Sequence, residues 1–131
     1  MSSLDLVKYL KTNPKIALVG ATNDKTKYGN IILHDLINKG YQVYPVNPRA
    51  KTIDGVPCYK NIEELSKEVD IGLVVFVVPP KITNEILPSL KKLNLKKVWI
   101  QPGAGDEVTR NLLEENEFEY MMDACVMVMS R

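Results

Sequence analysis

The chain has 131 residues, of which 45% are hydrophobic and 25% are charged, a balance that excludes an intrinsically disordered chain. Seventeen Lys and Arg residues against sixteen Asp and Glu give a formal net charge of +1, so overall attraction favours neither a nucleic acid nor an acidic membrane surface. We expect a single domain over residues 1–131, with no nucleic-acid or membrane partner and with any anion binding confined to local groups.

The sequence shows no pattern of a membrane-spanning or secretory segment. Its longest apolar run, Ile71 to Pro80, is too short to cross a bilayer, and its first residues lack the basic-then-apolar order of a signal peptide. The two cysteines, Cys58 and Cys125, are far apart and the chain has one histidine, so we expect neither a disulfide framework nor a metal site. These features predict a cytoplasmic protein.

Segments of strand and helix character alternate along the chain. A helix is expected first, over about residues 3–11. The expected strands are Lys15–Gly20, Tyr41–Val46, Ile71–Val78, Lys97–Gln101 and Glu119–Met122. The helices expected between them span about residues 30–39, 62–67, 82–93 and 107–116.

The helix ends and the topology follow from the same pattern. Gly40 suits a left-handed helix C-cap, and Asn61 and Asp106 suit N-caps. Pro88 lies inside the helix expected at residues 82–93 and should kink or divide it. Parallel strands joined by helical crossovers give a three-layer, Rossmann-like, doubly wound α/β sheet of five strands, for which we expect the order 2-1-3-4-5. Ligands of such sheets bind at the carboxyl ends of the strands, so the loops there form the candidate site.

The loop after the first strand contains small residues and opens a helix. Gly20 and Ala21 would let a phosphate approach the backbone, and the helix start offers unpaired amides and a partial positive charge. Thr22, Lys25 and Lys27 could add a hydroxyl and two cations. The spacing is not the GxGxxG of dinucleotide-binding domains, so a tight connection without a ligand stays open as the alternative.

The loop after the second strand lacks the acidic residue with which NAD-binding domains bind the ribose hydroxyls. Arg49 and Lys51 stand there instead, in the run Val46 to Lys51. Two cations suit a ribose that carries a phosphate, as in coenzyme A or NADP. The alternative is a solvated turn with surface charge.

The loops after the third and fourth strands could complete the site. Val78 leads into Pro79 and Pro80, a rigid apolar ledge that could pack against a purine ring or simply stiffen the entry to the next helix. The turn from Gln101 to Gly105 could bring backbone amides near the far end of a ligand, or could be a plain loop.

Two reactive side chains lie near these loops. For His34, inside the first crossover helix, no acidic partner is recognisable, so we interpret it as a surface histidine, with a ligand contact as the alternative. Cys125 follows the last strand and could be a packed apolar residue, or a thiol able to exchange with the thiol of a ligand.

Seven short motifs follow one another along the chain: Val19–Thr22, Tyr28–Asn30, Val46–Pro48, Asp54–Tyr59, Val78–Pro80, Val98–Gly103 and Met122–Cys125. As a set they resemble the stand-alone CoA-binding domain family, which is similar in turn to the nucleotide-binding domain of the succinyl-CoA synthetase alpha subunit. The resemblance runs from about Lys15 to Met129. It implies a Rossmann-type fold with coenzyme A lying across the carboxyl ends of the strands.

The resemblance also implies which residues contact the ligand. Residues 20–22 resemble the phosphate turn and residues 28–30 the helix start beneath it. Arg49 and Lys51 fall where the synthetase has a basic residue for the nucleotide phosphates, and residues 78–79 match its adenine-side strand end. The complete expected set is Gly20, Ala21, Thr22, Lys27, Tyr28, Gly29, Asn30, Asn47, Pro48, Arg49, Lys51, Val78, Pro79, Pro80, Gln101 and Gly103.

These expectations lead to a functional hypothesis. The active-site histidine of the synthetase comes from a following domain and has no counterpart here, so the resemblance does not imply ligase activity. We expect a protein that binds coenzyme A or an acyl-CoA without catalytic residues of its own, as a metabolic sensor or accessory module. The alternative is a small NADP-dependent oxidoreductase. A protein partner or a homo-oligomer is left open.

Overall fold

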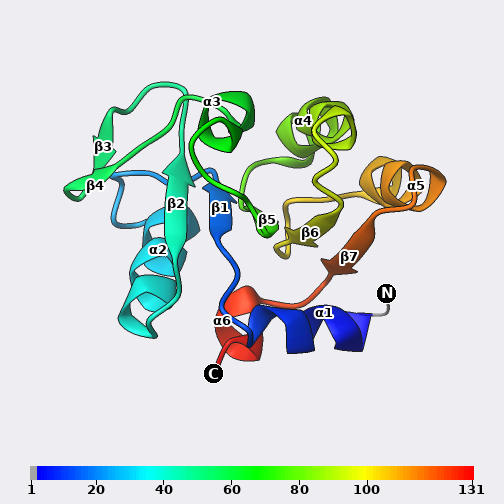
Figure 1. Cartoon of the computed structure of the whole chain (residues 1–131), viewed down its shortest axis with the longest axis horizontal. Coiled ribbons are helices and arrows are strands. Elements are labelled where there is room, and N and C mark those ends of the chain that lie inside the picture. Colours follow the sequence, from blue (N-terminus) through cyan, green and yellow to red (C-terminus); the bar gives the residue numbers. More distant parts are fainter. Residues whose placement is uncertain (1–2) are drawn as a thin grey trace.

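The computed structural model describes residues 3–131, in which a parallel five-stranded sheet lies between helices on both faces (Figure 1). The elements are α1 (Ser3–Leu10), β1 (Ile16–Val19), α2 (Tyr28–Asn38), β2 (Val43–Val46), β3 (Thr52–Ile53), β4 (Val56–Pro57), α3 (Ile62–Ser66), β5 (Leu73–Phe76), α4 (Pro80–Lys92), β6 (Lys97–Ile100), α5 (Glu107–Glu115), β7 (Glu119–Met122) and α6 (Val126–Met129). None of the helices within residues 3–131 is long and apolar enough to span a membrane.

The order of the main sheet is β2-β1-β5-β6-β7, and all its neighbouring strands run parallel. Counted along the chain within this sheet, that order is 2-1-3-4-5, so the predicted doubly wound fold is confirmed. The helix expected near residues 3–11 is α1. The order reverses between β1 and β5, which places the candidate site beside the carboxyl ends of these two strands.

Alternating side chains on the strands build one apolar core on each face of the sheet. Ile16 and Leu18 of β1 pack into the core that also contains buried residues of α1, α2 and α6. Ala17 and Val19 point to the other face, into the core shared with α3, α4 and α5. Strands buried on both faces need apolar residues at every position, which explains the continuous runs in β1 and β5. The result is three layers, visible in Figure 1.

Helix ends confirm the predicted caps. Gly40 has φ +92°, its amide donates to Ile37 O, and the amide of Tyr41 donates to Leu36 O, the pair of bonds that closes a helix at a left-handed residue. Asn61 accepts from the amide of Glu64, and Asp106 forms a capping box. Helix α2 starts at Tyr28, two residues earlier than expected.

Three short elements were absent from the prediction: the antiparallel pair β3–β4 and the helix α6. The segment after β4 closes the outer edge of β2, because the amide of Tyr59 donates to Pro45 O and the amide of Asn47 donates to Tyr59 O. Pro45 itself has no amide to offer to another strand. This edge is thereby protected from pairing with other chains.

Pro88 does not divide its helix, and that part of the prediction is wrong. Helix α4 runs without interruption from Pro80 to Lys92, with Pro88 inside it. Leu87 and Leu90 on either side are fully buried against the sheet, and this packing holds the helix together despite the missing amide.

Replacing Pro88 with Ala should stabilise the protein by about 2 kcal/mol. Alanine is roughly 3 kcal/mol more favourable than proline inside a helix, while the stiffer unfolded chain of the wild-type protein, which contains the proline, offsets about 0.4 to 1 kcal/mol of this. Urea unfolding measures the difference. Glu85→Ala, at another exposed position of α4, serves as the control and should change the free energy of unfolding by less than about 0.5 kcal/mol.

Candidate functional site

An open hollow of about 840 Å³ lies at the carboxyl ends of β1, β2, β5 and β6. Four loops contribute to it, each following one of these strands. Its lining residues are Gly20, Thr22, Thr26, Lys27, Tyr28, Gly29, Asn47, Arg49, Val77, Val78, Pro79, Pro80, Pro102, Gly103 and Ala104. Most of them come from the set predicted by the sequence.

The first wall of the hollow is a turn in which two backbones approach closely. A Cβ atom on Gly29 would lie 2.0 Å from the carbonyl oxygen of Gly20. Gly20 has φ +104°, and a Cβ there would lie 2.8 Å from the carbonyl oxygen of Val77. Only glycine fits both positions. The first turn of α2 therefore sits directly against the end of β1.

Helix α2 presents an open N-terminus to the hollow. Its N-cap, Lys27, makes no side-chain capping bond, and the first turn contains no acidic residue. The first amides of a helix have no partner within it and carry a partial positive charge. Together with the side chains of Thr22 and Lys27, these groups suit a phosphate.

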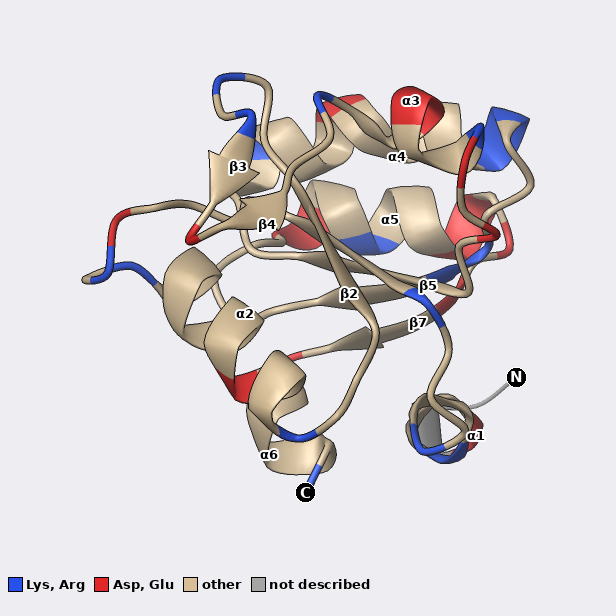
Figure 2. Cartoon of the chain, turned by 60° about the vertical axis from the view of Figure 1, so that its left-hand side comes forward, with Lys and Arg blue, Asp and Glu red and all other residues tan. Residues whose placement is uncertain are grey.

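The second wall adds a cation on a loop that is tied to the first. Asn47 donates through Nδ2 to Ala21 O at 2.9 Å and accepts through Oδ1 from the amide of Arg49 at 2.8 Å. Lys51, two residues beyond Arg49, is exposed. Figure 2 shows Lys and Arg on the loop before α2 and on the loop before β3. Among the described residues that line the hollow, Lys27 and Arg49 are charged and none is acidic.

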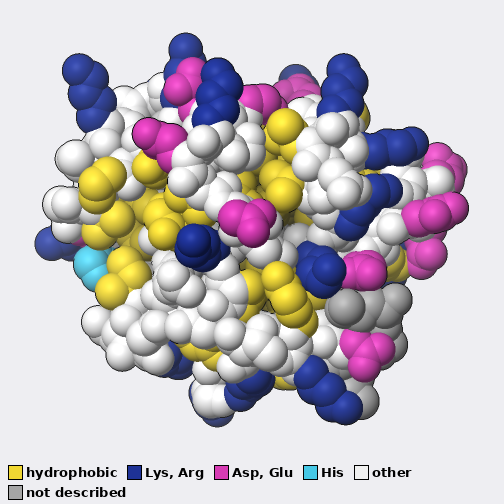
Figure 3. Space-filling view, in the orientation of Figure 1, with side chains coloured by type: hydrophobic (Ala, Val, Ile, Leu, Met, Phe, Trp, Pro, Cys, Tyr) yellow, Lys and Arg dark blue, Asp and Glu magenta, His cyan; other side chains and the backbone are white. Residues whose placement is uncertain are grey.

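This concentration of positive charge is local. Over the face shown in Figure 3, Lys and Arg side chains are interspersed with Asp and Glu. The formal net charge is +1, so an anion is attracted by these loops and not by the molecule as a whole.

The opposite wall is apolar and rigid. Val77 and Val78 end the segment after β5, Pro79 is the N-cap of α4, and Pro80 is its first residue. Pro102 approaches from the loop after β6. Prolines fix the backbone without offering amides, so this wall offers a flat apolar surface.

Five members of the predicted set lie outside the lining. Ala21 and Asn30 are buried beneath the first loop, while Pro48 and Lys51 are exposed beside Arg49. Gln101 is buried and turned away, since its Oε1 accepts from the amide of Val126 at 2.7 Å and its Nε2 contacts Cys125 Sγ at 3.4 Å. Thr26, Val77, Pro102 and Ala104 line the hollow but were not predicted, although each is adjacent to a predicted residue or motif.

His34 has an acidic partner, contrary to the prediction. Its Nε2 lies 2.6 Å from Oδ2 of Asp54, which also accepts from Asn30 Nδ2 at 2.8 Å. The hydrogen bonds from His34 and Asn30 hold the pKa of the Asp54 carboxyl below its usual value. Asp54 is 20 residues away in sequence, and the unpredicted β3–β4 hairpin brings it to the helix.

The two cysteines differ in their surroundings. Cys125 is the N-cap residue of α6 and contacts the buried Gln101. Burial raises the pKa of the Cys58 thiol, which lowers its reactivity at neutral pH. Cys58 is therefore a packing residue, and Cys125 is the thiol nearer to the loop after β6.

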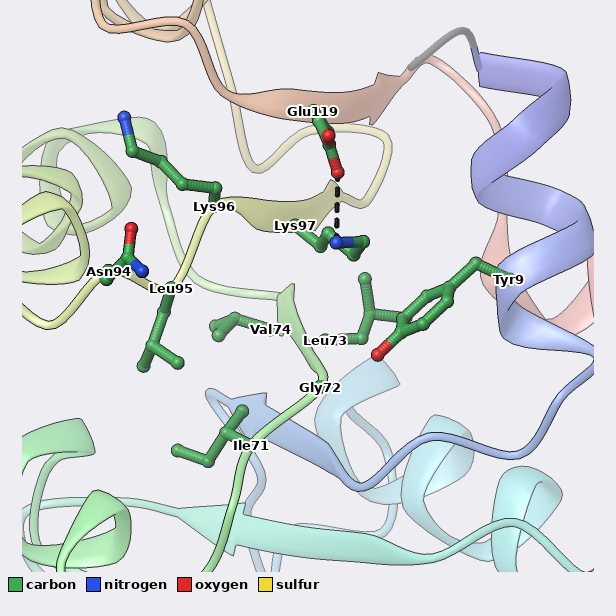
Figure 4. A pocket seen from close by; sticks show the side chains of 10 residues that line it. All are labelled: Tyr9, Ile71, Gly72, Leu73, Val74, Asn94, Leu95, Lys96, Lys97 and Glu119. Carbon is green, nitrogen blue, oxygen red and sulfur yellow. Dashed lines mark ion pairs between the residues drawn. The ribbon is translucent and has the colours of Figure 1, made fainter.

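A second hollow, of about 310 Å³, lies at the amino ends of β5, β6 and β7 (Figure 4). Both lysines that line it are bound by other groups: Lys97 Nζ lies 3.2 Å from Glu119 Oε2 and 5.1 Å from the centre of the Tyr9 ring, and Lys96 Nζ donates to Asn116 O at 2.7 Å. The hollow at the carboxyl ends differs in that none of the described residues that line it is acidic.

Comparison with known proteins identifies the family. Residues 14–131 match the model of the CoA binding domain family. The chain belongs to this family. This CoA-binding domain is 36% identical over 108 residues to the alpha subunit of acetate–CoA ligase (ADP-forming) II from Pyrococcus furiosus, covering 80% of the chain and 23% of that subunit. It is 32% identical over 108 residues to acetate–CoA ligase (ADP-forming) from Methanocaldococcus jannaschii, covering 82% of the chain and 15% of that enzyme.

A solved structure matches over nearly its whole length. A conserved hypothetical protein from Pyrococcus furiosus is 46% identical with a TM-score of 0.83, covering 88% of this chain and 97% of that one. The predicted resemblance is thus confirmed. The CoA-binding domain spans less than a quarter of the ligases that it resembles. The family and these relatives give no support to the alternative of an NADP-dependent oxidoreductase.

Replacing Gly29 with Ala should destabilise the CoA-binding domain by about 2 kcal/mol. The new methyl group would collide with the Gly20 carbonyl, which outweighs the roughly 1 kcal/mol that Ala gains over Gly in a helix. Urea unfolding tests this, with Asn38→Ala on the same helix as a control. A wild-type midpoint for Gly29→Ala would show that the close approach relaxes at no cost.

Proposed function

We propose that the hollow at the carboxyl ends of the strands binds coenzyme A or a short acyl-CoA. The observation that carries this proposal is the pairing of an open helix N-terminus with Arg49 in a lining that contains no carboxylate. A carboxylate would favour ribose hydroxyls, whereas cations favour a ribose phosphate. Membership of the CoA-binding domain family supports coenzyme A over other phosphorylated ribosides.

The proposed pose assigns each part of the ligand to one wall. The diphosphate lies against Gly20, Thr22 and the first amides of α2, and the ribose phosphate lies beside Arg49 and Lys51. The adenine packs on the ledge formed by Val78 and the prolines after it, which offers the flat apolar surface that a purine needs.

The pantetheine arm then runs toward the loop after β6, past Gly103. Gln101 and Cys125 lie behind that loop, joined by the contact between Nε2 and Sγ. The lining offers hydroxyl, amide, lysine and guanidinium groups but no imidazole, carboxylate or thiol among the described residues. This composition supports a binding module that holds the ligand, with any chemistry supplied by a partner.

Calorimetric titration with coenzyme A, dephospho-coenzyme A, NADP and NAD in parallel tests the proposal. Coenzyme A should bind best, and removal of the ribose phosphate should weaken binding. Preference for NADP would overturn the proposal in favour of a reductase, and the absence of binding to all four would leave the hollow without this function.

The double substitution Arg49→Ala and Lys51→Ala should weaken coenzyme A binding by about 2 to 4 kcal/mol, because each charge-assisted contact contributes roughly 1.5 to 3 kcal/mol and the exposure of both side chains to solvent lowers their sum. The same titration measures it. Lys91→Ala with Lys92→Ala removes two exposed cations from α4 and serves as the charge-matched control. Equal affinities of the two double variants would contradict the assignment of the basic loop.

A further inference from the structure

We infer that His34 and Asp54 are positioning residues that hold the basic loop over the phosphate turn and so set the selectivity for a ribose phosphate. The inference rests on the proposed function, because the ribose phosphate is the group whose recognition it concerns. Neither side chain lines the hollow. Both act through the segment that carries Arg49 and Lys51.

Asp54 joins two elements through hydrogen bonds. Its Oδ2 accepts from His34 Nε2 at 2.6 Å and from Asn30 Nδ2 at 2.8 Å. Both donors belong to α2, and Asn30 is 4% exposed. One carboxylate oxygen therefore joins the β3–β4 hairpin to the helix whose N-terminus faces the hollow.

The same hairpin is also bound to the phosphate turn. Asn30 Nδ2 also donates to Thr22 O at 2.9 Å. Asn23 accepts from the amide of Asp54 and donates to Thr52 O, each at 3.0 Å. These bonds, with the contacts of Asp54 to His34 and Asn30, are called the clamp below.

The hairpin has a tight turn. Asp54 and Gly55 have φ +49° and +83°, which is the backbone of a two-residue turn with both central residues left-handed. Such a turn matches the twist of its strands and fixes the backbone that carries the Asp54 side chain. The contacts of Asp54 with His34 and Asn30 therefore hold the whole hairpin and not the Asp54 side chain alone.

The clamp determines where Arg49 and Lys51 lie. Residues 48–51 span the interval between Asn47, which is fixed to Ala21 O, and Thr52, where the hairpin begins. Both ends of this short interval are thus tied to the phosphate turn. Releasing the hairpin end lets Arg49 and Lys51 move away from the helix N-terminus. The ribose phosphate would lose its cations, while the rest of the ligand would keep its contacts.

A purely structural role of the pair formed by His34 and Asp54 predicts a different effect on ligand binding. The side chain of His34 is 49% exposed, and pairs of this kind contribute little to stability. Any general loosening of the fold would weaken all ligands equally. A change in the ratio of affinities for coenzyme A and dephospho-coenzyme A is therefore the distinguishing readout.

The test measures that ratio by calorimetry in wild type, His34→Leu and His34→Gln. The leucine variant removes the donor, and the glutamine variant can still donate from about the position of Nε2. The ratio should fall about fivefold to tenfold in His34→Leu, which is less than the loss of a direct hydrogen bond to a charged group would give, because His34 acts on the ligand through the loop; glutamine should restore most of it. Asp35→Asn breaks the pair with Lys39 on the same helix, at 2.7 Å, and should leave the ratio unchanged.

Each other result has a defined meaning. Equal weakening of both ligands in a folded His34→Leu variant, or an unchanged ratio, would overturn the inference while coenzyme A binding stands. A wild-type protein that binds both ligands equally would also overturn it. Failure of wild type to bind either ligand would overturn the proposed function itself.

A second measurement guards against an unfolded variant. Asp54→Asn preserves the turn, because Asn before Gly also favours this hairpin, but it removes the charge that His34 contacts. In this variant amide hydrogen exchange should accelerate in residues 48–57 and remain slow in β1 and β5. Unchanged exchange in residues 48–57 would contradict the clamp.

Discussion

The site depends on the contact between the first turn of α2 and the end of β1. The Gly20 carbonyl lies so close to Gly29 that no side chain fits between them, and this brings the open end of the helix to the edge of the sheet. A helix N-terminus attracts an anion only over about one turn, so a displacement of a few ångströms would remove most of its effect. The remaining loops of the hollow are arranged around this fixed point.

Polar side chains, more than apolar packing, connect those loops. Asn47 joins the loop after β2 to the loop after β1, Asn23 joins that loop to Thr52 of β3, and Asn30 joins α2 to Thr22. Loops at a sheet edge bury little apolar surface, so hydrogen bonds determine their relative positions. The cations of the second loop are themselves exposed, and the hydrogen bonds of the three asparagines determine where they lie. Because hydrogen bonds position the cations locally, a molecule with almost no net charge can present a local anion site.

The relation to the ligases suggests how such a domain is used. In those enzymes the matching region is a small part of a much longer chain. The solved hypothetical protein from Pyrococcus furiosus matches this chain over almost its full length. The matching region therefore occurs both within long ligase chains and as nearly the whole of a short chain. A surface that only holds a ligand can serve either, because the reacting groups need not belong to the domain that binds it.

The sequence by itself determined the five strands, their order and the loops that could bind a ligand. Alternation of apolar runs with amphipathic segments is a local signal, and the handedness of the crossovers leaves few ways to arrange it. The sequence also contains a signal for the hairpin, Asp54 followed by Gly55, which is a residue pair typical of a two-residue β-turn. Tertiary structure alone decided that Asp54 meets His34, that Gln101 turns toward Cys125, and that α4 continues through Pro88. Those outcomes depend on partners distant in sequence and on packing against the sheet, and neither is encoded in any short segment.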